Sequence, residues 1–347
     1  MSPISSFVFE ATRACNLSCA HCYNIWKGPG AVGPLDPKPL STAQTLDMLE
    51  QFFQQSGATL CTLSGGEPLL RADLPEIVKF IADRGSYANL VTNGTLLDEA
   101  MLDRLGSGSI AIYELPLLCA HRGIHDAMSG LEGAFDRVTN AIAELKLRGE
   151  TVVGVFVATR TNLPHFEETL ELGVALGLDG LMFNRFNPGG EGRAHLDLQA
   201  SPAELQAALD LAEEGAQRYD FPISCSIALP PCLIDTARYQ RLTFGFCAAG
   251  TDRAYYTLDA VGHVRPCNHS ATVLGNLRQQ SFEELSSSAS MREFVAARPR
   301  ACSGCHVEHE CLGGCKAAAE VCCGSPWEMD PFLAAFRSAV PGSVPPR

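Results

Sequence analysis

The distribution of cysteine constrains this chain more than any other feature of its sequence. Fifteen of its 347 residues are cysteines, of which three lie within Cys15–Cys22 and six within Cys302–Cys323. The N-terminal residues Met1–Arg13 contain no basic segment followed by a long apolar core, so they do not resemble a secretion signal. Because disulfide frameworks belong to exported chains, this uneven pattern indicates ligation of metal ions or clusters by thiolates.

Composition and charge limit where such a protein works. The 46% hydrophobic and 19% charged residues are typical of a folded globular protein. The longest apolar runs, such as Val152–Ala158, are too short to cross a bilayer. The formal charge of −13 disfavours broad contact with nucleic acid or anionic lipid. We therefore expect a cytoplasmic protein with no membrane or nucleic-acid partner.

The first half of the chain alternates short β-rich runs with amphipathic helical periods. The expected strands are Phe7–Thr12, Thr59–Leu63, Ala88–Thr92, Ser109–Leu115, Val152–Thr159 and Gly180–Phe186. The expected helices are Thr42–Gln55, Leu74–Arg84, Leu97–Leu105, Ala134–Leu147 and Phe166–Ala175. This alternation predicts an α/β fold, a partial (β/α)6 TIM-like barrel, whose active site lies at the carboxyl ends of the strands.

The remaining chain predicts further units. Residues 1–195 form the barrel, and residues 196–245 form a bridging helical region that contains a helix at Pro202–Tyr219, capped by Ser201. Residues 246–330 are rich in cysteine, glycine and histidine, and we expect clusters to hold this small domain together because its apolar core is small. Residues 331–347 are expected to be a tail that is loose at Ala339–Arg347.

Three thiols follow the first expected strand on one short loop: Cys15, Cys19 and Cys22. Thiolates are soft ligands that suit iron–sulfur clusters and zinc. Three of them leave one iron of a cubane without a protein ligand, free to bind a substrate or cofactor. The alternative for this motif alone is a zinc site that takes a fourth ligand from elsewhere in the chain.

Two polar, glycine-containing turns follow the next two strands. Ser64-Gly65-Gly66-Glu67-Pro68 comes after the second strand, and Thr92-Asn93-Gly94-Thr95 comes after the third. Paired glycines let the backbone approach a ligand closely, and a buried carboxylate such as Glu67 receives an ammonium group. Taken alone, each segment also reads as a simple turn.

In this order the three loops resemble the radical S-adenosylmethionine (SAM) superfamily over residues 6–190. The resemblance implies that Cys15, Cys19 and Cys22 hold a [4Fe–4S] cluster whose open iron chelates SAM, which is cleaved to a 5′-deoxyadenosyl radical that abstracts a substrate hydrogen. It also implies that Gly65, Gly66 and Glu67 meet the methionine end of SAM and that Asn93 lies near the cofactor. An aromatic ring usually precedes the last cysteine in this family, and His21 stands there instead.

The C-terminal cysteines form a second pattern. Cys247 is followed by Gly262 and Cys267, and then by Cys302-x2-Cys305-x5-Cys311-x3-Cys315 and the pair Cys322–Cys323. A zinc ribbon is the alternative for Cys302–Cys315 alone. The whole spacing resembles the SPASM extension, which holds two auxiliary [4Fe–4S] clusters. The resemblance assigns Cys302, Cys305 and Cys311, with Cys322 or Cys323, to one cluster and Cys247, Cys267 and Cys315 to the other. The fourth ligand of the latter set stays open between the spare member of the pair, Cys232 and none.

Several polar residues lie outside these patterns. Cys119 follows the fourth expected strand and is a candidate hydrogen donor to a substrate radical, with inert packing as the alternative. Asn184 and Arg185 end the sixth strand and are candidate cofactor-binding residues, and a rim ion pair is the alternative for Arg185. His121, His125 and Asp126 are further candidates for general acid–base work.

The resemblance implies a radical SAM/SPASM enzyme, most simply one that matures a ribosomally made peptide or protein by crosslinking, oxidation or epimerisation. The competing reading is a dehydrogenase or epimerase of a small molecule such as a sugar, aminoglycoside or cofactor precursor. An electron-transfer or zinc-scaffold protein is a third reading, but neither role needs the Gly-Gly-Glu-Pro turn. The expected partners are an electron donor such as flavodoxin or ferredoxin and a separate leader-binding protein.

Overall fold

The alternation of strands and helices builds one twisted sheet that curls into an open barrel. A computed structural model describes residues 4–28 and 40–336. Within them the sheet has eleven strands in the order β11-β10-β9-β1-β2-β3-β4-β5-β6-β7-β8. Neighbouring strands from β9 through β1 to β8 run parallel, and β10 and β11 are antiparallel additions at one edge. The strands are β1 (Ser6–Thr12), β2 (Leu60–Gly65), β3 (Tyr87–Val91), β4 (Ile112–Pro116), β5 (Val152–Ala158), β6 (Gly180–Arg185), β7 (Ile223–Cys225), β8 (Leu242–Phe244), β9 (Tyr256–Asp259), β10 (His263–Arg265) and β11 (Gly275–Asn276).

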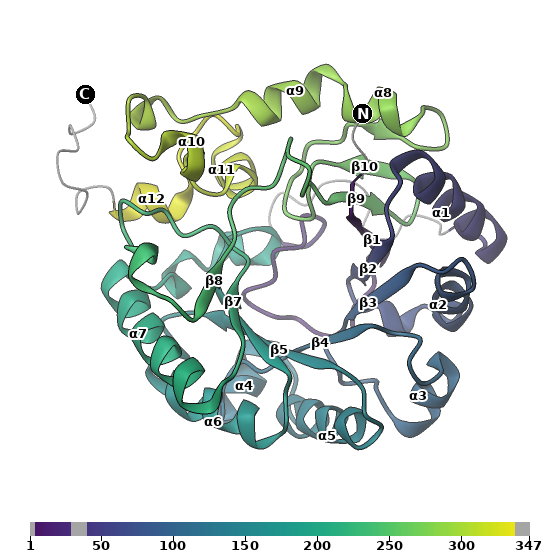
Figure 1. The fold of residues 1–347 in the computed structure, drawn as a ribbon, viewed down its shortest axis with the longest axis horizontal. Helices are drawn as coiled ribbons and strands as arrows, with labels where there is room; N and C mark the ends of the chain where they lie inside the picture. Colours follow the sequence, from purple (N-terminus) through teal and green to yellow (C-terminus); the bar gives the residue numbers. More distant parts are fainter. Residues whose placement is uncertain (1–3, 29–39, 337–347) are drawn as a thin grey trace.

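Helices cover the outside of the curled sheet, as the end-on view shows (Figure 1). Capping boxes at Ser41 and Ser201 fix where α1 and α7 begin. The helices are α1 (Thr42–Ser56), α2 (Leu74–Asp83), α3 (Glu99–Leu105), α4 (Arg122–Ser129), α5 (Ala134–Leu147), α6 (Phe166–Ala175), α7 (Pro202–Tyr219), α8 (Phe282–Ser286), α9 (Ala289–Ala296), α10 (Glu308–Cys311), α11 (Lys316–Cys323) and α12 (Pro331–Phe336). Short 3₁₀ turns occur at Pro68–Leu70, Leu163–His165, Gly190–Ala194, Leu196–Leu198, Thr236–Arg238 and Arg300–Cys302.

The expected partial barrel is confirmed, and each of its six strands and five helices forms within a few residues of its expected bounds. The structure adds α4, which the sequence pattern did not reveal because it spans only eight residues and begins without a side-chain cap. The bridging region also differs from expectation. Besides α7 it supplies β7 and β8, which extend the barrel sheet past β6.

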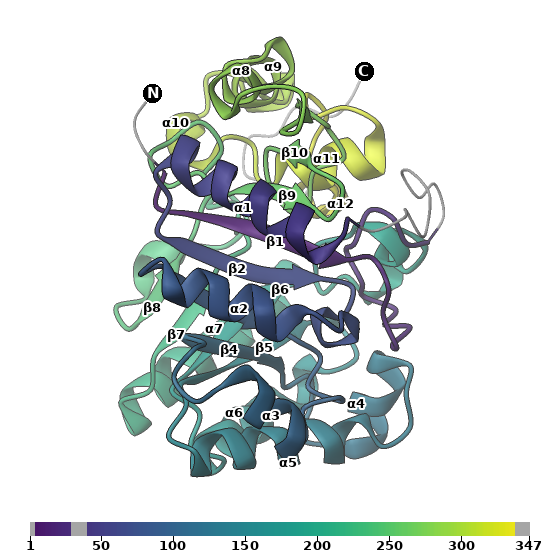
Figure 2. The ribbon, with the colours of Figure 1, turned by 90° about the vertical axis from the view of Figure 1, so that its right-hand side faces the viewer.

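The cysteine-rich region begins inside the same sheet. Its strand β9 pairs with β1 in parallel, so residues far apart in sequence become neighbours at the barrel edge (Figure 2). Phe282 of α8 is fully buried and packs on Tyr256 and on Phe52 of α1. This part of the region therefore has more apolar core than its composition suggested, and the segment around Cys302–Glu310 is the part with little buried apolar surface.

The expected C-terminal tail is in part a helix. Phe332 and Leu333 of α12 are buried against the rest of the protein, whereas residues 337–347 lie outside the described part of the chain. No helix among the described residues is both long and apolar enough to span a membrane.

Candidate active site

The carboxyl ends of the barrel strands surround a cavity of about 320 Å³. Valine and methionine side chains from the strands form much of its wall, and the loops after the strands add polar groups. All three loops that the sequence singled out reach this cavity, through Cys19 and Cys22, through Gly65 and Gly66, and through Asn93. A cavity large enough for a small ligand therefore lies where the active site was expected.

Cys15, Cys19 and Cys22 converge on one side of the cavity. The loop turns tightly because the Cys22 N–H donates to the Cys19 carbonyl at 3.1 Å. Burial, and then the negative charges of Cys22 and Cys15, raise the pKa of Cys19 to about 12. A cationic centre between the three sulfurs would reverse this effect, so the donor set fits an iron–sulfur cluster.

His21 also faces this cavity. Its Nδ1 atom is buried and has no hydrogen-bond partner among the described residues. Burial, followed by the charge of His125, lowers the pKa of His21 to about 4, which keeps its ring neutral. A buried nitrogen without a partner at the cavity wall fits a bound polar ligand, because such atoms are otherwise costly.

The paired glycines support the cysteine loop. The Gly66 N–H donates to Thr12 O at 2.7 Å. A Cβ added to Gly66 would lie 2.1 Å from Ala14 O, and one added to Gly65 would lie 2.4 Å from Thr12 O. Gly65 also has a φ of +127°, which side chains disfavour. These glycines are needed because two backbones meet here, so that the second loop braces the first.

Glu67 lies behind the cavity wall rather than in it. Its two carboxylate oxygens accept hydrogen bonds from Leu69 N at 3.0 Å, Thr92 Oγ1 at 2.7 Å and Asn93 N at 2.8 Å. The side chain is fully buried, and burial raises its pKa. The expected contact with an ammonium group therefore has no support here. Glu67 instead ties the second loop to the third.

Asn93, Asn184 and Arg185 all line the cavity, as expected. Asn93 Nδ2 donates to Asn16 Oδ1 at 2.9 Å, which links the third loop to the cysteine loop. Asn184 Oδ1 accepts from Ser226 N at 2.8 Å. Arg185 is buried and pairs with Asp330, so the rim ion pair considered for it is present.

Glu114 is a cavity residue that sequence reasoning missed. It lies on β4, faces the cavity and is mostly buried, and burial alone raises its pKa from 4.5 to about 7. The signal in the sequence was an acidic residue inside an otherwise apolar strand. A carboxyl group with this pKa can exchange a proton near neutral pH.

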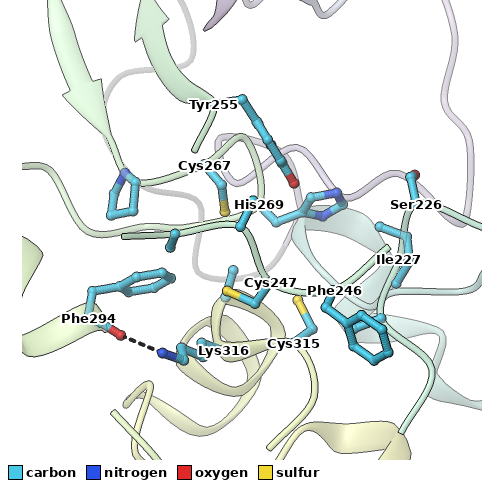
Figure 3. Close-up of a pocket in the computed structure, with 15 residues that line it drawn as sticks. Ser226, Ile227, Phe246, Cys247, Tyr255, Cys267, His269, Phe294, Cys315 and Lys316 are labelled. Carbon is cyan, nitrogen blue, oxygen red and sulfur yellow. Dashed lines mark hydrogen bonds between the residues drawn. The ribbon is translucent and has the colours of Figure 1, made fainter. Parts of the chain in front are cut away.

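A second pocket collects Cys247, Cys267 and Cys315, whose sulfur atoms point into a common space (Figure 3). Burial, and then the charges of Cys315 and Cys247, raise the pKa of Cys267 well above its ordinary value. Lys316 lies beside them, donates to Phe294 O at 3.2 Å and Val295 O at 2.6 Å, and has its pKa lowered by burial to about 8. The three thiols fit the second auxiliary cluster of the sequence prediction.

His269 connects the two sites. It lines both the barrel cavity and the three-thiol pocket, together with Ser226 and Ile227. Its ring lies 4.1 Å from that of Tyr23, the residue after Cys22, and Asn187 Nδ2 lies 3.2 Å from its Nδ1. Burial, and then the charge of Arg265, lower the pKa of His269 to about 3. A neutral aromatic contact thus joins the two cysteine-bearing loops.

Cys302, Cys305 and Cys311 are also neighbours of one another. The pair expected to complete this set lies elsewhere. Cys322 Sγ is 3.7 Å from Pro188 O, and Cys323 is exposed at the end of α11. The structure therefore gives no support to either as a ligand of the Cys302 set.

Cys119 is buried outside the cavity. The His121 N–H donates to its sulfur at 3.4 Å, and Thr169 lies next to it. Leu118 rather than Cys119 lines the cavity, so this arrangement favours inert packing over hydrogen donation.

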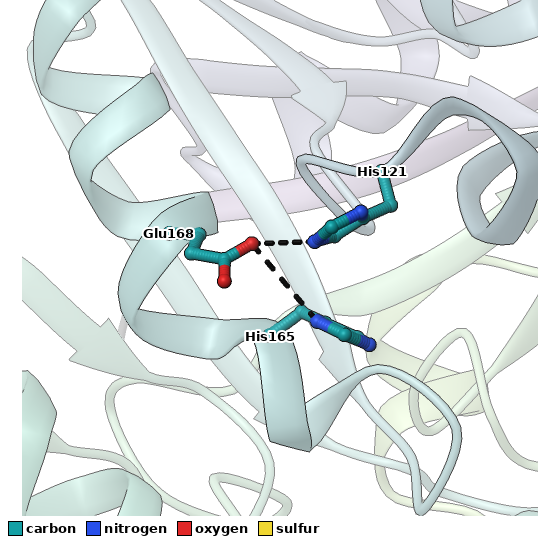
Figure 4. Close-up of side chains that lie close together, drawn as sticks. All are labelled: His121, His165 and Glu168. Carbon is teal, nitrogen blue, oxygen red and sulfur yellow. Dashed lines mark hydrogen bonds and ion pairs between the residues drawn. The ribbon is translucent and has the colours of Figure 1, made fainter.

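The polar residues that follow Cys119 also have partners away from the cavity. His121 Nε2 lies 2.5 Å from Glu168 Oε2, and His165 Nδ1 lies 4.0 Å from the same atom, in a partly exposed cluster at the barrel rim (Figure 4). Asp126 accepts from the backbone N–H groups of Gly133 and Phe135, both at 2.8 Å. An ion pair and a turn explain these residues without a catalytic role.

Comparison with known proteins supports the chemistry read from the site. A sequence model of the radical SAM superfamily matches residues 9–173, and a model of the SPASM iron–sulfur cluster-binding domain matches residues 247–306. The chain is 26% identical over 345 residues to the AdoMet-dependent heme synthase of Methanosarcina barkeri, covering 93% of this chain and 94% of that protein. It is 29% identical over 336 residues to the PqqA peptide cyclase of Ruegeria pomeroyi, covering 93% of this chain and 85% of that protein.

Solved structures share the fold. Streptococcus suis SuiB bound to S-adenosylmethionine aligns with a TM-score of 0.76 at 15% identity, covering 96% of this chain and 77% of that chain. The enzyme anSMEcpe with bound AdoMet and the Kp18Cys peptide aligns with a TM-score of 0.72 at 19% identity, covering 96% and 95%.

Three converging thiols at the mouth of an open parallel barrel, followed by a thiol-rich domain on the same sheet, define a radical SAM enzyme with auxiliary clusters. The chain belongs to the radical SAM superfamily and carries a SPASM domain. Its cofactors are accordingly S-adenosylmethionine and [4Fe–4S] clusters.

Proposed function

We propose that this radical SAM enzyme matures a ribosomally made peptide, by crosslinking, oxidising or epimerising a residue. The observation that carries the proposal is the barrel cavity, which is walled largely by apolar side chains and contains the carboxyl group of Glu114, for which residues 4–28 and 40–336 offer no charged partner. Such a cavity suits a peptide side chain that enters from the mouth of the barrel. Recognition of the rest of the peptide would then fall to surfaces around the mouth or to a separate leader-binding protein.

Similar proteins support a peptide over a tetrapyrrole. Among them are the PqqA peptide cyclase of Ruegeria pomeroyi, and SuiB solved with its precursor peptide SuiA. A heme precursor, the substrate class suggested by the name of the other relative, carries several carboxylates. The guanidinium of Arg185 on the cavity wall is already paired with Asp330, and Glu114 would repel such a ligand.

The residues of the site take separate roles in this proposal. Cys15, Cys19 and Cys22 hold the first cluster, and Asn93 and Asn184 present amide groups to the cavity that holds SAM. When bound, the first cluster and SAM supply a 5′-deoxyadenosyl radical, and the auxiliary clusters supply electron storage. An external donor such as flavodoxin or ferredoxin would reduce the first cluster.

Glu114 is the residue of the wall best suited to move a proton. Its carboxyl group has a raised pKa of about 7 and faces the cavity, so it can accept a proton that leaves the substrate when a new bond forms.

A small cationic molecule such as an aminoglycoside is the second candidate substrate. Glu114 favours it, because a carboxylate in a largely apolar cavity attracts an ammonium group. Both candidates use the same residues, so the substrate itself must be tested.

The first experiment measures cleavage of SAM. Anaerobically reconstituted protein with dithionite should release 5′-deoxyadenosine, and Cys19→Ala should abolish this release. Cys61→Ala, which changes a buried cysteine inside β2, is the matched control and should retain it. Absence of 5′-deoxyadenosine from the parent protein would overturn the assignment of activity.

The second experiment separates the substrates. The protein is incubated with a short precursor peptide encoded beside its gene, and in parallel with an aminoglycoside. A crosslink or an oxidation removes two hydrogens from the peptide, which mass spectrometry detects, and an epimerisation in deuterated water adds deuterium. Modification of the aminoglycoside alone would replace the peptide proposal with the second candidate.

A further inference from the structure

Cys232 occupies a fixed position on the connection between β7 and β8. The backbone turns there because Leu233 N and Ile234 N both donate to Pro230 O, at 2.9 Å and 3.1 Å. Leu229 and Ile234 on either side are buried, with 2% and 1% of their surface exposed. The half-buried thiol of Cys232 therefore has a defined place between two apolar anchors.

The thiols of Cys302, Cys305 and Cys311 lie near that place. Every pair among these three cysteines and Cys232 lies within electrostatic reach. The three C-terminal members are brought together by tight turns, in which Cys305 N donates to Cys302 O at 3.1 Å and Cys311 N donates to Val307 O at 2.9 Å. Cys232 approaches from the barrel side, so the four sulfurs form a set to which both parts of the chain contribute.

A buried ion pair independently holds these two segments together. Arg185 Nε donates to Ala228 O at 2.7 Å, and its NH2 group pairs with Asp330 Oδ2 at 2.5 Å. The same Asp330 oxygen accepts from Cys315 N at 2.7 Å. One guanidinium thus connects the start of the β7–β8 connection to the segment that follows Cys311, without involving any of the four thiols.

The cysteines that the SPASM pattern would use instead point elsewhere. Cys315 caps α11, and the helix carries Cys322 and Cys323 about 10–12 Å along its axis. At that end Cys322 lies against Pro188, and Cys323 is exposed. Cys232 therefore lies beside Cys302, Cys305 and Cys311, whereas neither Cys322 nor Cys323 is observed there.

We propose that Cys232 is the fourth protein ligand of the auxiliary cluster held by Cys302, Cys305 and Cys311. The inference rests on the presence of auxiliary clusters in the proposed enzyme, and not on the identity of its substrate. It makes this cluster fully ligated by protein, which suits electron transfer and excludes substrate binding at its irons. It also makes the cluster a covalent tie between the barrel sheet and the C-terminal segment.

The test compares three cysteine variants by metal content. Cys232→Ala is purified without oxygen beside Cys225→Ala, a buried cysteine on β7, and Cys322→Ala. The parent should bind about twelve iron atoms for three [4Fe–4S] clusters. Cys232→Ala should lose about one to four of these atoms and one of the electron paramagnetic resonance signals of the reduced protein, and the other two variants should keep both. Parental iron content and signals in Cys232→Ala, or loss of iron from Cys322→Ala instead, would overturn the assignment.

A second variant covers the case in which Cys232→Ala does not fold. Cys232→Ser keeps the size of the side chain and offers oxygen in place of sulfur, so the Mössbauer spectrum of one cluster should change in a protein of parental circular dichroism. An unchanged spectrum would refute the proposal. Release of 5′-deoxyadenosine depends on the first cluster. If the parent protein released none, the proposed activity would be refuted, and the metal content of the variants would still decide the role of Cys232.

Discussion

The buried pair of Arg185 and Asp330 offers the sharpest test of how the two parts of the protein are joined. Both side chains are essentially unexposed, at 1% and 0%, and the guanidinium lies 5.0 Å from the ring of Phe332. Asp330→Asn keeps the shape of the side chain and removes its charge. Arg185 then stays buried as an unpaired cation beside a new amide N–H group that cannot accept its hydrogen bond.

The expected cost follows from this burial. Removing one member of a buried ion pair costs about 3–5 kcal/mol, because the remaining charge keeps its desolvation penalty without its partner. For a chain of this length, that loss corresponds to a melting temperature about 4–7 °C lower. Asp330 also accepts from the Cys315 and Phe332 backbone N–H groups, at 2.7 Å and 2.9 Å. The variant should therefore also bind less iron in the three-thiol pocket.

The assay is thermal unfolding followed by circular dichroism under anaerobic conditions, with iron measured on the same samples. Asp83→Asn is the control, because Asp83 forms an exposed pair with Lys79, with 62% and 74% of the side chains accessible. Its loss should cost about 0.5 kcal/mol or less. If the Asp330 and Asp83 variants have the same melting temperature and the same iron content, the Arg185–Asp330 pair does not join the two parts of the protein as argued.

Three further predictions concern the cavity and its supports. Gly66→Ala places a Cβ 2.1 Å from Ala14 O, so it should displace the cysteine loop and lower SAM cleavage at least about tenfold. Gly123→Ala is the control: its added Cβ meets no atom within 4 Å, and cleavage should stay unchanged. Because burial raises the pKa of Glu114 from 4.5 to about 7, the stability linked to its protonation is complete below pH 4.5 and is lost as the pH rises through 7. Glu114→Gln should thus exceed the parent by about 3 kcal/mol in urea unfolding at pH 8 and by about 1 kcal/mol or less at pH 5, and equal pH dependence would contradict the reasoning. Cys119→Ala should retain both SAM cleavage and product formation, since its thiol faces Thr169, and loss of product alone would restore the hydrogen-donor hypothesis.

The strands and helices of the barrel could be predicted because each depends on a local pattern. The helix Ala134–Leu147 and the helix Phe166–Ala175 form at their expected bounds, since their apolar periods lie within the segments themselves. The strands β7 and β8 were missed because each spans only three residues and depends on pairing with a neighbouring strand, β7 with β6 and β8 with β7, which no local pattern records. The position of the Glu67 carboxylate could not be predicted for a related reason, since its direction is set by Thr92 and Asn93 on another loop.

The sequence by itself determined the chemistry of this protein. The spacing of Cys15, Cys19 and Cys22 after a strand predicts thiolate ligation, because ligands on one short loop are close whatever surrounds them. The class of enzyme followed from the resemblance of this loop, the two polar turns after it and the later cysteines to the radical SAM/SPASM family. Only the tertiary structure decided which distant groups share a centre. Cys232 lies beside Cys302, and β9 lies beside β1, because packing and strand pairing act through space between segments far apart in the chain.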